Sequence, residues 1–325
     1  MYPERKPEWK SERRDPVLTR PMDVLEQFPV RKSKTRKRKF RQEAARLLES
    51  YGYTCHEERG SMGAVNLVAG DPERAKYLIT AHYDTCARML VPNFITPCNA
   101  AIYLLYQLVL VLGIVGGSAL LGIGAGILTG SPGVGELVYL VCLFGILYLM
   151  MAGPANPTNA NDNTSGVVTL LEIARTLPEN RREQVCFVLF DLEELGLVGS
   201  ASYKKAHPKA IRNQLALNLD CVGDGETIML FPTGKLKKSP EKLAHLRTCC
   251  GSFGTRRILL REKGFSVYPS DQYQFPYGVG ICALRGKRIL YLSRIHTAKD
   301  TTLNPTNVNI LRAALITLIT CPQGE

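Results

Sequence analysis

The chain has 325 residues, enough for one large α/β domain with appended segments. Its formal net charge is +12, and residues 1–46 contain 15 Lys/Arg against 7 Asp/Glu. The charged N-terminus lacks the apolar stretch of a cleavable secretory signal. The ten cysteines form no CxxC pair, which argues against a cysteine-based zinc site. Free thiols without a secretory signal favour a reducing compartment.

The first segment, residues 1–38, combines prolines with mixed charge, and we expect a basic, flexible tail. Eight of the eleven residues from Arg31 to Arg41 are Lys or Arg. They lead into Lys39–Tyr51, whose apolar residues recur at helical spacing. Three interpretations of the basic run are open: a solvated helix face, a contact with anionic lipid, or a nucleic-acid patch. The apolar region further along the chain favours lipid over nucleic acid.

Two strands are expected at residues 64–69 and 76–82, and an apolar region follows them. Ala100–Leu128 has no charged residue, and Val134–Gly153 has only Glu136. A Thr-Gly-Ser-Pro-Gly turn separates the two stretches. A bilayer core needs about 20 apolar residues per helix, and glycines four positions apart let two helices approach closely. We predict a two-span membrane hairpin within residues 99–153; the alternative is a helical hairpin buried in a soluble core.

A two-span hairpin returns the chain to the side of the membrane from which it left. The tip of this hairpin has no positive charge, whereas the rest of the chain is basic. The positive-inside tendency therefore predicts a cytoplasmic body and an outside tip. This orientation agrees with the free thiols.

Helices and strands alternate after the hairpin. The expected strands are apolar runs at 185–190, 215–219, 227–231, 257–260 and 288–292, and the expected helices are 167–177, 195–206 and 308–319. Near-continuous apolar strands between helices predict an α/β fold. Its central sheet should be mostly parallel, although mixed, with helices on both faces.

Acidic and histidine side chains recur where the expected strands end. His82 ends a strand, and Asp84 two positions later can hold the second ring nitrogen of that histidine. Asp162 lies in the amide-rich loop NANDNTSG, where capping of the next helix is the simpler role. Glu193 and Glu194 follow a buried strand, where an acidic first helical turn is the simpler role.

Two further positions repeat the pattern. Asp220 follows another apolar strand, and His296 lies in the segment IHTAKDT with Asp300 available to support it. The carboxyl ends of parallel strands share one edge of an α/β sheet, in the crevice where ligands bind. Two histidines, two aspartates and a glutamate pair form a donor set that suits Zn²⁺. The set predicts a metal-dependent hydrolase.

As an ordered set, HYD, NDNxSG, EELG, NLD and HTxxDT resemble the motifs of the M28 family of co-catalytic zinc aminopeptidases. The segment from Ser270 to Ile281 also resembles that family's stretch before its last metal ligand. The resemblance covers residues 39–86 and 156–325. It implies a zinc-aminopeptidase-like α/β fold and the removal of N-terminal residues from peptides.

The resemblance also implies two zinc ions per chain and a role for each residue. The first ion would be held by His82, Asp162 and Asp220, and the second by Asp162, Glu194 and His296, with Asp162 bridging. Glu193 would act as general base and then as general acid. Asp84 and Asp300 would orient the metal ligands, and we assign Asp84 to catalysis together with Glu193.

The chain departs from the family pattern at two places. Eighty positions separate His82 from Asp162 (162 − 82), where the family has a short loop. Ile295 precedes the last histidine, where some secreted members have an aromatic residue. Neither departure changes a proposed ligand.

Two other functions are open. A glutaminyl-peptide cyclotransferase-like enzyme on a related scaffold typically has one zinc. A catalytically inactive membrane adaptor would use the basic tail and the hairpin to recruit partners. The expected organisation is a tail (1–38), a catalytic domain in two parts (39–98 and 154–325) and a membrane hairpin (99–153). The expected partners are a peptide substrate, the membrane and anionic lipid at residues 31–41.

Overall fold

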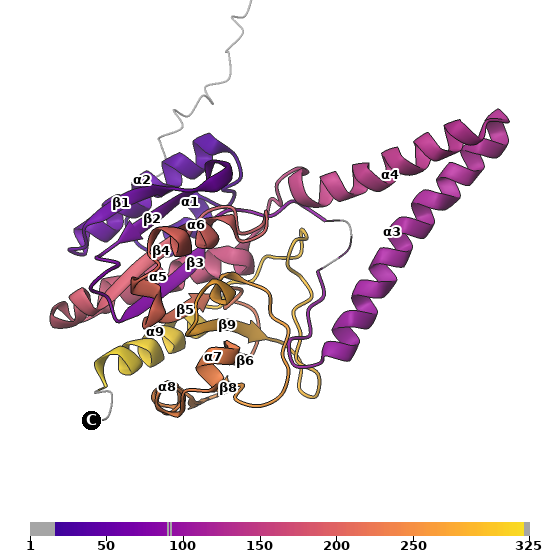
Figure 1. Ribbon diagram of the computed structural model, residues 1–325. Helices are drawn as coiled ribbons and strands as arrows, with labels where there is room; N and C mark the ends of the chain where they lie inside the picture. The colour runs from indigo at the N-terminus through magenta and orange to yellow at the C-terminus, as the bar shows by residue number, and fades with distance from the viewer. Residues whose placement is uncertain (1–16, 90, 92, 322–325) are drawn as a thin grey trace, which may run out of the picture.

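A mixed sheet of nine strands forms the centre of the molecule (Figure 1). The computed structural model describes residues 17–89, 91 and 93–321. The strand order is β1-β2-β4-β3-β5-β9-β6-β8-β7. The strands are β1 (Cys55–Arg59), β2 (Val65–Ala69), β3 (Tyr77–His82), β4 (Val185–Phe190), β5 (Leu215–Leu219), β6 (Thr227–Pro232), β7 (Gly251–Phe253), β8 (Arg256–Leu260) and β9 (Gly278–Leu284). The predicted α/β fold with a mixed central sheet is confirmed.

The middle of the sheet is parallel, and an antiparallel pairing borders it on each side; beyond that border β6 pairs in parallel with β8. Strands β4, β3, β5 and β9 pair in parallel, whereas β1, β2 and β4 pair antiparallel on one side and β6 pairs antiparallel with β9 on the other. The carboxyl ends of β3, β4 and β5 therefore lie along one edge of the sheet. That edge is where an α/β sheet presents ligand-binding residues.

Helices cover both faces of the sheet. They are α1 (Asp23–Gln27), α2 (Lys34–Ser50), α5 (Gly166–Thr176), α6 (Val198–Ala206), α7 (Gly234–Lys237), α8 (Pro240–Arg247) and α9 (Pro305–Thr320). Successive residues of β4 point to opposite faces, as the period of a strand requires. Phe187 joins the core formed with α2, α5 and α9, and Val188 joins a second core with Tyr203 of α6.

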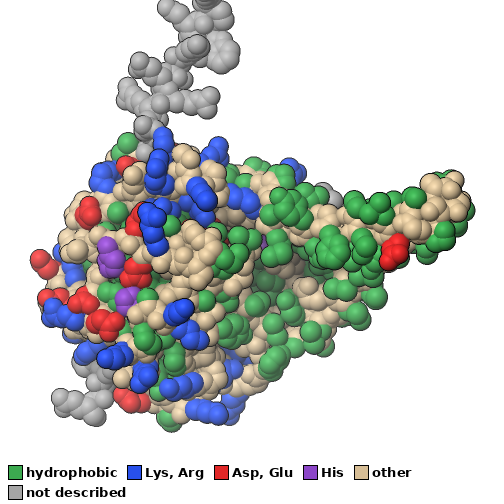
Figure 2. Space-filling model, turned by 45° about the horizontal axis from the view of Figure 1, so that its top comes forward, with side chains coloured by type: hydrophobic (Ala, Val, Ile, Leu, Met, Phe, Trp, Pro, Cys, Tyr) green, Lys and Arg blue, Asp and Glu red, His purple; other side chains and the backbone are tan. Residues whose placement is uncertain are grey.

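A long helical hairpin projects from this body (Figure 1). It consists of α3 (Ala100–Thr129) and α4 (Pro132–Ala152), both long and apolar enough to cross a membrane. Hydrophobic side chains cover both arms in Figure 2, and Leu128 is 88% exposed. A hairpin buried in a soluble core, the alternative considered above, would not expose these side chains.

Glycines bring the two arms of the hairpin together near its tip. A Cβ atom on Gly122 would lie 2.7 Å from the carbonyl oxygen of Gly135, and one on Gly135 would lie 3.2 Å from the Cα atom of Gly126. Side chains at these positions would force the helices apart. Small residues are the usual means by which apolar helices pack closely.

Part of the N-terminal segment packs against the body. Residues 1–16 of the expected tail lie outside the described residues. In contrast to the expected flexibility of residues 17–38, Leu18, Val24 and Phe28 are buried in the main core. Helix α2 begins at Lys34, five residues earlier than expected, because the Ser33 hydroxyl accepts a hydrogen bond from the Arg36 N–H and caps it.

The basic run from residue 31 to 41 divides into buried and exposed side chains. Arg31, Lys37 and Arg41 are buried. Lys37 pairs with Asp191 at 2.7 Å, and Arg41 pairs with Glu57 at 2.7 Å. These three cations stabilise the fold, so only the exposed part of the run is open to a lipid surface.

The expectation of a strand at residues 288–292 was wrong. This segment forms only isolated bridges in the part of the chain that the structure describes, including Ile95 with Leu292 and Arg285 with Tyr291. The strand that enters the sheet is β9 instead, and the polar edge strand β1 and the short β7 were also not anticipated.

Candidate metal centre

The loops that follow β3, β4 and β5 gather the predicted acidic and histidine residues at one edge of the sheet. His82 is the last residue of β3, Glu193 and Glu194 follow β4, and Asp220 follows β5 directly. Asp162 reaches the same place from the loop before α5, and His296 from the loop before α9. All six predicted side chains therefore approach one another.

Asp162 lies between the two histidines. Its Oδ1 atom is 3.3 Å from Nε2 of His82, and its Oδ2 atom is 3.1 Å from Nε2 of His296. Each carboxylate oxygen thus faces a different imidazole. A carboxylate in this position can contribute one oxygen to each of two neighbouring cations.

A second carboxylate accompanies each histidine. Asp220 Oδ1 lies 3.7 Å from Nε2 of His82, and Glu194 Oε2 lies 3.4 Å from Nε2 of His296. His82, Asp162 and Asp220 offer three donor atoms within 4.8 Å of one another. Glu193 groups in the same way with His82 and Glu194, which are ligands of different proposed ions.

Hydrogen bonds to the backbone hold the loops of the site. Asp84 accepts the N–H groups of Glu193 (3.1 Å) and Glu194 (3.3 Å), and its Oδ1 lies 3.5 Å from Nδ1 of His82. Asp300 accepts the N–H of Asp162 at 2.9 Å. Asp300 therefore positions the backbone of the bridging aspartate, whereas the sequence had suggested the His296 ring as its partner.

The amide-rich loop links the ends of two strands. The side-chain amide of Asn163 donates to the carbonyl oxygens of His82 (3.3 Å) and Leu219 (3.0 Å), and its oxygen accepts the N–H of Cys221. These bonds fix β3 relative to β5. The amide of Asn163 therefore joins the ends of β3 and β5, a role beyond capping of the next helix.

Several residues beside the proposed ligands have left-handed backbone conformations. The φ angle is 62° at His296, 55° at Leu192 before the glutamate pair, and 55° at Cys221 after Asp220. Non-glycine residues adopt such angles at an energetic cost, and they concentrate at functional sites. The loops are therefore held in geometries that the surrounding hydrogen bonds impose.

Burial and neighbouring charges shift the pKa values of the imidazoles and carboxylates in the site. Burial disfavours the charged imidazole of His296, but Glu194 and Asp162 outweigh it and raise the pKa of His296 to about 9. Burial raises the pKa of Glu194 to about 8 and that of Glu193 well above its ordinary value. Burial also acts on Asp162, but hydrogen bonds from His296 and His82 hold the pKa of Asp162 below its ordinary value.

The imidazole and carboxylate donors of the site fit a bound divalent metal ion. The buried Oε1 atom of Glu194 has no hydrogen-bond partner among the described residues. A buried acceptor without a donor is costly, and a cation held by Glu194 and its neighbours would satisfy it. Imidazole and carboxylate donors in this number suit zinc.

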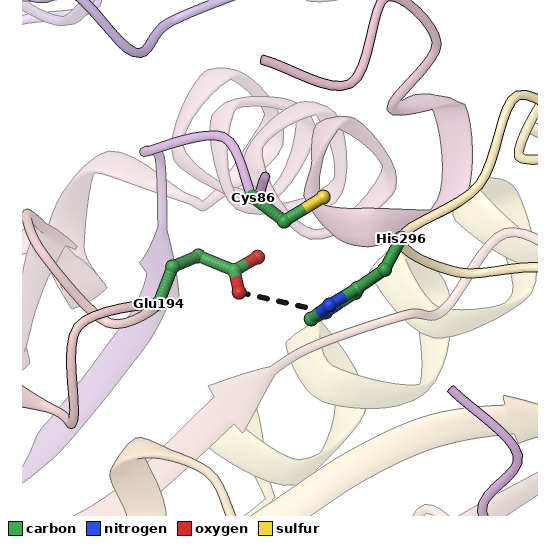
Figure 3. Close-up of side chains that lie close together, drawn as sticks. All are labelled: Cys86, Glu194 and His296. Atoms are coloured by element: carbon green, nitrogen blue, oxygen red, sulfur yellow. Dashed lines mark ion pairs between the residues drawn. The ribbon is translucent and has the colours of Figure 1, made fainter. Parts of the chain in front are cut away.

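Two residues near the site were not assigned a role from the sequence. Cys86 lies two residues beyond Asp84, and its thiol groups with Glu194 and His296 within 4.8 Å (Figure 3). Asp271 is fully buried, and burial raises the pKa of its carboxyl to about 7. A lone cysteine has no spacing pattern to reveal it. The sequence pointed to Asp271 only because it lies in the segment before His296 that resembles the M28 family.

Together, the sheet and the buried imidazoles and carboxylates at its edge define an α/β protein with a candidate metal centre. The model of peptidase family M28 matches residues 148–319, which is more than half of the chain. The chain belongs to peptidase family M28, and the resemblance expected from the motifs is confirmed.

The comparisons with individual proteins agree with the family. The chain is 40% identical over 75 residues to aminopeptidase YwaD of Bacillus subtilis, a match that spans 22% of this chain and 16% of YwaD. Among solved structures, the LapA aminopeptidase of Legionella pneumophila has a TM-score of 0.55 at 13% identity, over 92% of this chain and 68% of LapA. A glutaminyl cyclase of Bacteroides thetaiotaomicron has a TM-score of 0.55 at 14% identity, over 93% of this chain and 95% of that chain. At these identities the structures show a shared fold.

Proposed function

We propose that the chain is a zinc metallopeptidase of the aminopeptidase type that carries two zinc ions. The observation that carries this proposal is the position of Asp162, whose two oxygens face different imidazoles at 3.3 and 3.1 Å. His82, Asp162 and Asp220 would hold one ion, and Asp162, Glu194 and His296 the other. Bound zinc supplies a Lewis acid that polarises a carbonyl and a water of lowered pKa.

Glu193 is the general base in this proposal. Its side chain lies close to His82 and Glu194, one ligand from each donor group, and Asp84 accepts its backbone N–H. The Glu193 carboxylate can accept and return a proton, as general acid–base catalysis requires. A carboxylate oxygen of Glu193 takes the proton of the attacking water and then gives it to the nitrogen of the leaving amine.

The acidic pocket also favours a substrate with a free α-amine. Carboxylates outnumber the cationic groups here, and a protonated N-terminus complements their charge. Removal of N-terminal residues is therefore the favoured form of hydrolysis. A panel of aminoacyl arylamides with matching N-acetylated compounds tests this preference, since blocking the amine should abolish release of the arylamine.

Glutaminyl cyclisation is the second candidate, because the fold is shared with a glutaminyl cyclase. The two donor groups on either side of Asp162 favour hydrolysis. Metal analysis of the purified full-length protein in detergent, paired with a leucyl-arylamide assay, separates the two. Two zinc ions per chain and chelator-sensitive release support a peptidase. One zinc with conversion of an N-terminal glutamine would overturn it, and a metal-free inert protein would favour an adaptor.

The hairpin is proposed to span the membrane. At about 1.5 Å per residue, α3 and α4 are about 45 and 32 Å long, against a hydrocarbon core of about 30 Å. We place the body in the cytoplasm and the hairpin tip outside, following the basic character of the body. Cleavage by an added protease at a site inserted in the tip, in sealed vesicles of known orientation, tests this placement.

Exposed basic residues lie at the base of the hairpin. The ammonium of Lys32 donates to the carbonyl oxygen of Met151, near the end of α4, and Lys34, Arg36 and Arg38 on the adjoining α2 are exposed. Such cations beside a spanning helix attract anionic headgroups. We propose that they contact anionic lipid.

A further inference from the structure

The thiol of Cys86 lies close to the side chains of His296 and Glu194. Figure 3 shows the three side chains close together, with the sulfur of Cys86 on the side of His296. Their donor atoms all lie within 4.8 Å of one another. Cys86 is 1% exposed, so its thiol is shielded from solvent.

The chain on both sides of Cys86 is held in place. The carbonyl oxygen of Cys86 accepts the N–H of Asn156 at 3.1 Å, and the N–H of Arg88 donates to the carbonyl oxygen of Pro154 at 2.8 Å. The next residue, Ala87, forms a bridge with Ala155. These contacts join the loop after β3 to the segment that follows α4, so the backbone of Cys86 is fixed beside the site.

An independent observation points to a cation in the same space. The Oε1 atom of Glu194 is buried without a hydrogen-bond partner in the described part of the chain, and the side chain is 10% exposed. The other oxygen of Glu194 faces His296 at 3.4 Å. The thiol itself makes a weak contact with the side-chain oxygen of Asn159, at 3.6 Å. A metal ion would satisfy the carboxylate and the sulfur together.

We propose that Cys86 is a metal ligand, as a thiolate, at the position of His296, Glu194 and Asp162. This inference rests on the proposed metal site. It gives that position four protein donors, the number found in closed tetrahedral zinc sites. The position of His82, Asp162 and Asp220 keeps three donors, the number found in catalytic sites with an open place.

The two positions therefore differ in the metals they select. Thiolate is a soft ligand that favours zinc and disfavours magnesium or manganese. The four-donor position should hold zinc firmly, while the three-donor position exchanges its ion more readily. A chelator should consequently remove the ion beside His82 first.

Cobalt substitution tests the assignment by a spectroscopic signal that does not depend on activity. Metal-free full-length protein in detergent is titrated with Co²⁺, and a thiolate–cobalt bond gives a charge-transfer band in the near ultraviolet. The wild type should show this band together with the visible d–d absorption of bound cobalt. Cys86→Ala should lose the band, leave the affinity for Co²⁺ at the His82 position unchanged, and bind Co²⁺ at the His296 position at least tenfold more weakly than the wild type does. Even residues that merely support a ligand are worth about 10- to 100-fold in metal affinity.

Cys186→Ala is the matched control, because Cys186 is a fully buried thiol of β4 in a hydrophobic cluster with Tyr203. This variant should retain the whole band. Cys86→Ser keeps the size of the side chain and should also lose the charge-transfer band. With two variants, poor folding of one of them does not decide the result. Binding of two Co²⁺ with chelator-sensitive hydrolysis but no band in the wild type would overturn the role of Cys86 alone. Absence of bound cobalt would overturn the proposed metal site as well.

Discussion

Asp84 holds the backbone of Glu193, whose N–H donates to the Asp84 carboxylate at 3.1 Å. The other oxygen of Asp84 accepts the N–H of Glu194 at 3.3 Å, and the same side chain lies 3.5 Å from Nδ1 of His82. One buried carboxylate thus positions a proposed base and two proposed ligands at once. Groups that orient metal ligands in this way usually affect affinity nearly as much as the ligands themselves.

Replacing Asp84 by Asn should weaken both metal binding and catalysis. An asparagine has one acceptor oxygen, so its NH2 group would face one of the two N–H groups that Asp84 now accepts. We expect metal affinity and kcat/KM each to fall about 10- to 100-fold, measured by metal titration and arylamide hydrolysis.

Asp71→Asn is the control for that change. Asp71 is exposed, and its Oδ1 atom accepts the N–H groups of both Glu73 (2.9 Å) and Arg74 (3.3 Å) far from the site. Its substitution should leave both quantities unchanged. Equal effects of the two substitutions would contradict a specific role for Asp84.

Glu193→Gln should separate catalysis from metal binding. Glutamine is isosteric with glutamate but cannot accept and return a proton, and Glu193 is not a proposed ligand. We expect kcat to fall by about 10²- to 10⁴-fold with both zinc ions retained. Glu241→Gln, on the exposed face of α8, is the control. Turnover of the Glu193 variant at the wild-type rate would remove Glu193 from the mechanism.

The stability of the metal-free protein should fall as the pH rises. The pKa of His296 is raised from 6.5 to about 9 and that of Glu194 from 4.5 to about 8. Groups with a raised pKa stabilise the fold fully below their ordinary pKa and lose that contribution as the pH rises through the shifted value, because the folded state binds more protons. Asp162 acts in the opposite direction, but only in acid, near and below its ordinary pKa of 3.8.

Thermal unfolding between pH 6.5 and 8.5 measures this effect. We expect the Tm of the metal-free protein to decline across the range, and the increase in Tm on adding zinc to grow, because zinc replaces the protons that the site otherwise needs. A zinc-induced increase that stays constant or shrinks with pH would contradict binding at His296 and Glu194.

The sequence predicts the centre of the sheet better than its edges. The strands β3, β4 and β5 are mainly apolar and buried on both faces, and each was expected within one residue of its observed bounds. The edge strand β1 reads CHEER, which has no apolar face to reveal it. Two glycines weaken the strand signal of β9, although its neighbours β5 and β6 bury it completely.

The site residues were predictable because they follow strands whose carboxyl ends must share one edge. Their supporting contacts were not, because these depend on the path of loops. Asp300 bonds to the backbone of Asp162 across 138 positions. Cys86 enters the site only because the loop after β3 is bound to the segment after α4.

Arg31 should stabilise the fold, although it belongs to the basic run that the sequence suggested for lipid contact. Its buried guanidinium donates to the carbonyl oxygens of Tyr83 and Phe28, both at 2.6 Å, and to the hydroxyl of Thr164 at 3.1 Å. Lysine at this position cannot serve three acceptors in a fixed plane. We expect Arg31→Lys to lower the free energy of unfolding by about 2–4 kcal/mol, measured by urea titration. The exposed Arg38→Lys should change it by less than about 0.5 kcal/mol, and similar values for both would contradict the structural role of Arg31.

The hairpin should influence which peptides reach the site, beyond anchoring the protein. The loop of Cys86 pairs with residues 154–156 directly after α4. The ring of Phe94 contacts Tyr106 of α3 and Tyr291, with centroid distances of 5.5 and 5.6 Å. Both arms of the hairpin therefore leave the body beside the candidate site. Replacing residues 99–153 by a Gly/Ser linker should give a protein that still cleaves short soluble peptides. It should lose preference for apolar and membrane-bound substrates, which is measured by comparing kcat/KM over soluble and vesicle-anchored peptides of the same N-terminal sequence. An unchanged ranking of substrates would show that the hairpin acts as an anchor alone.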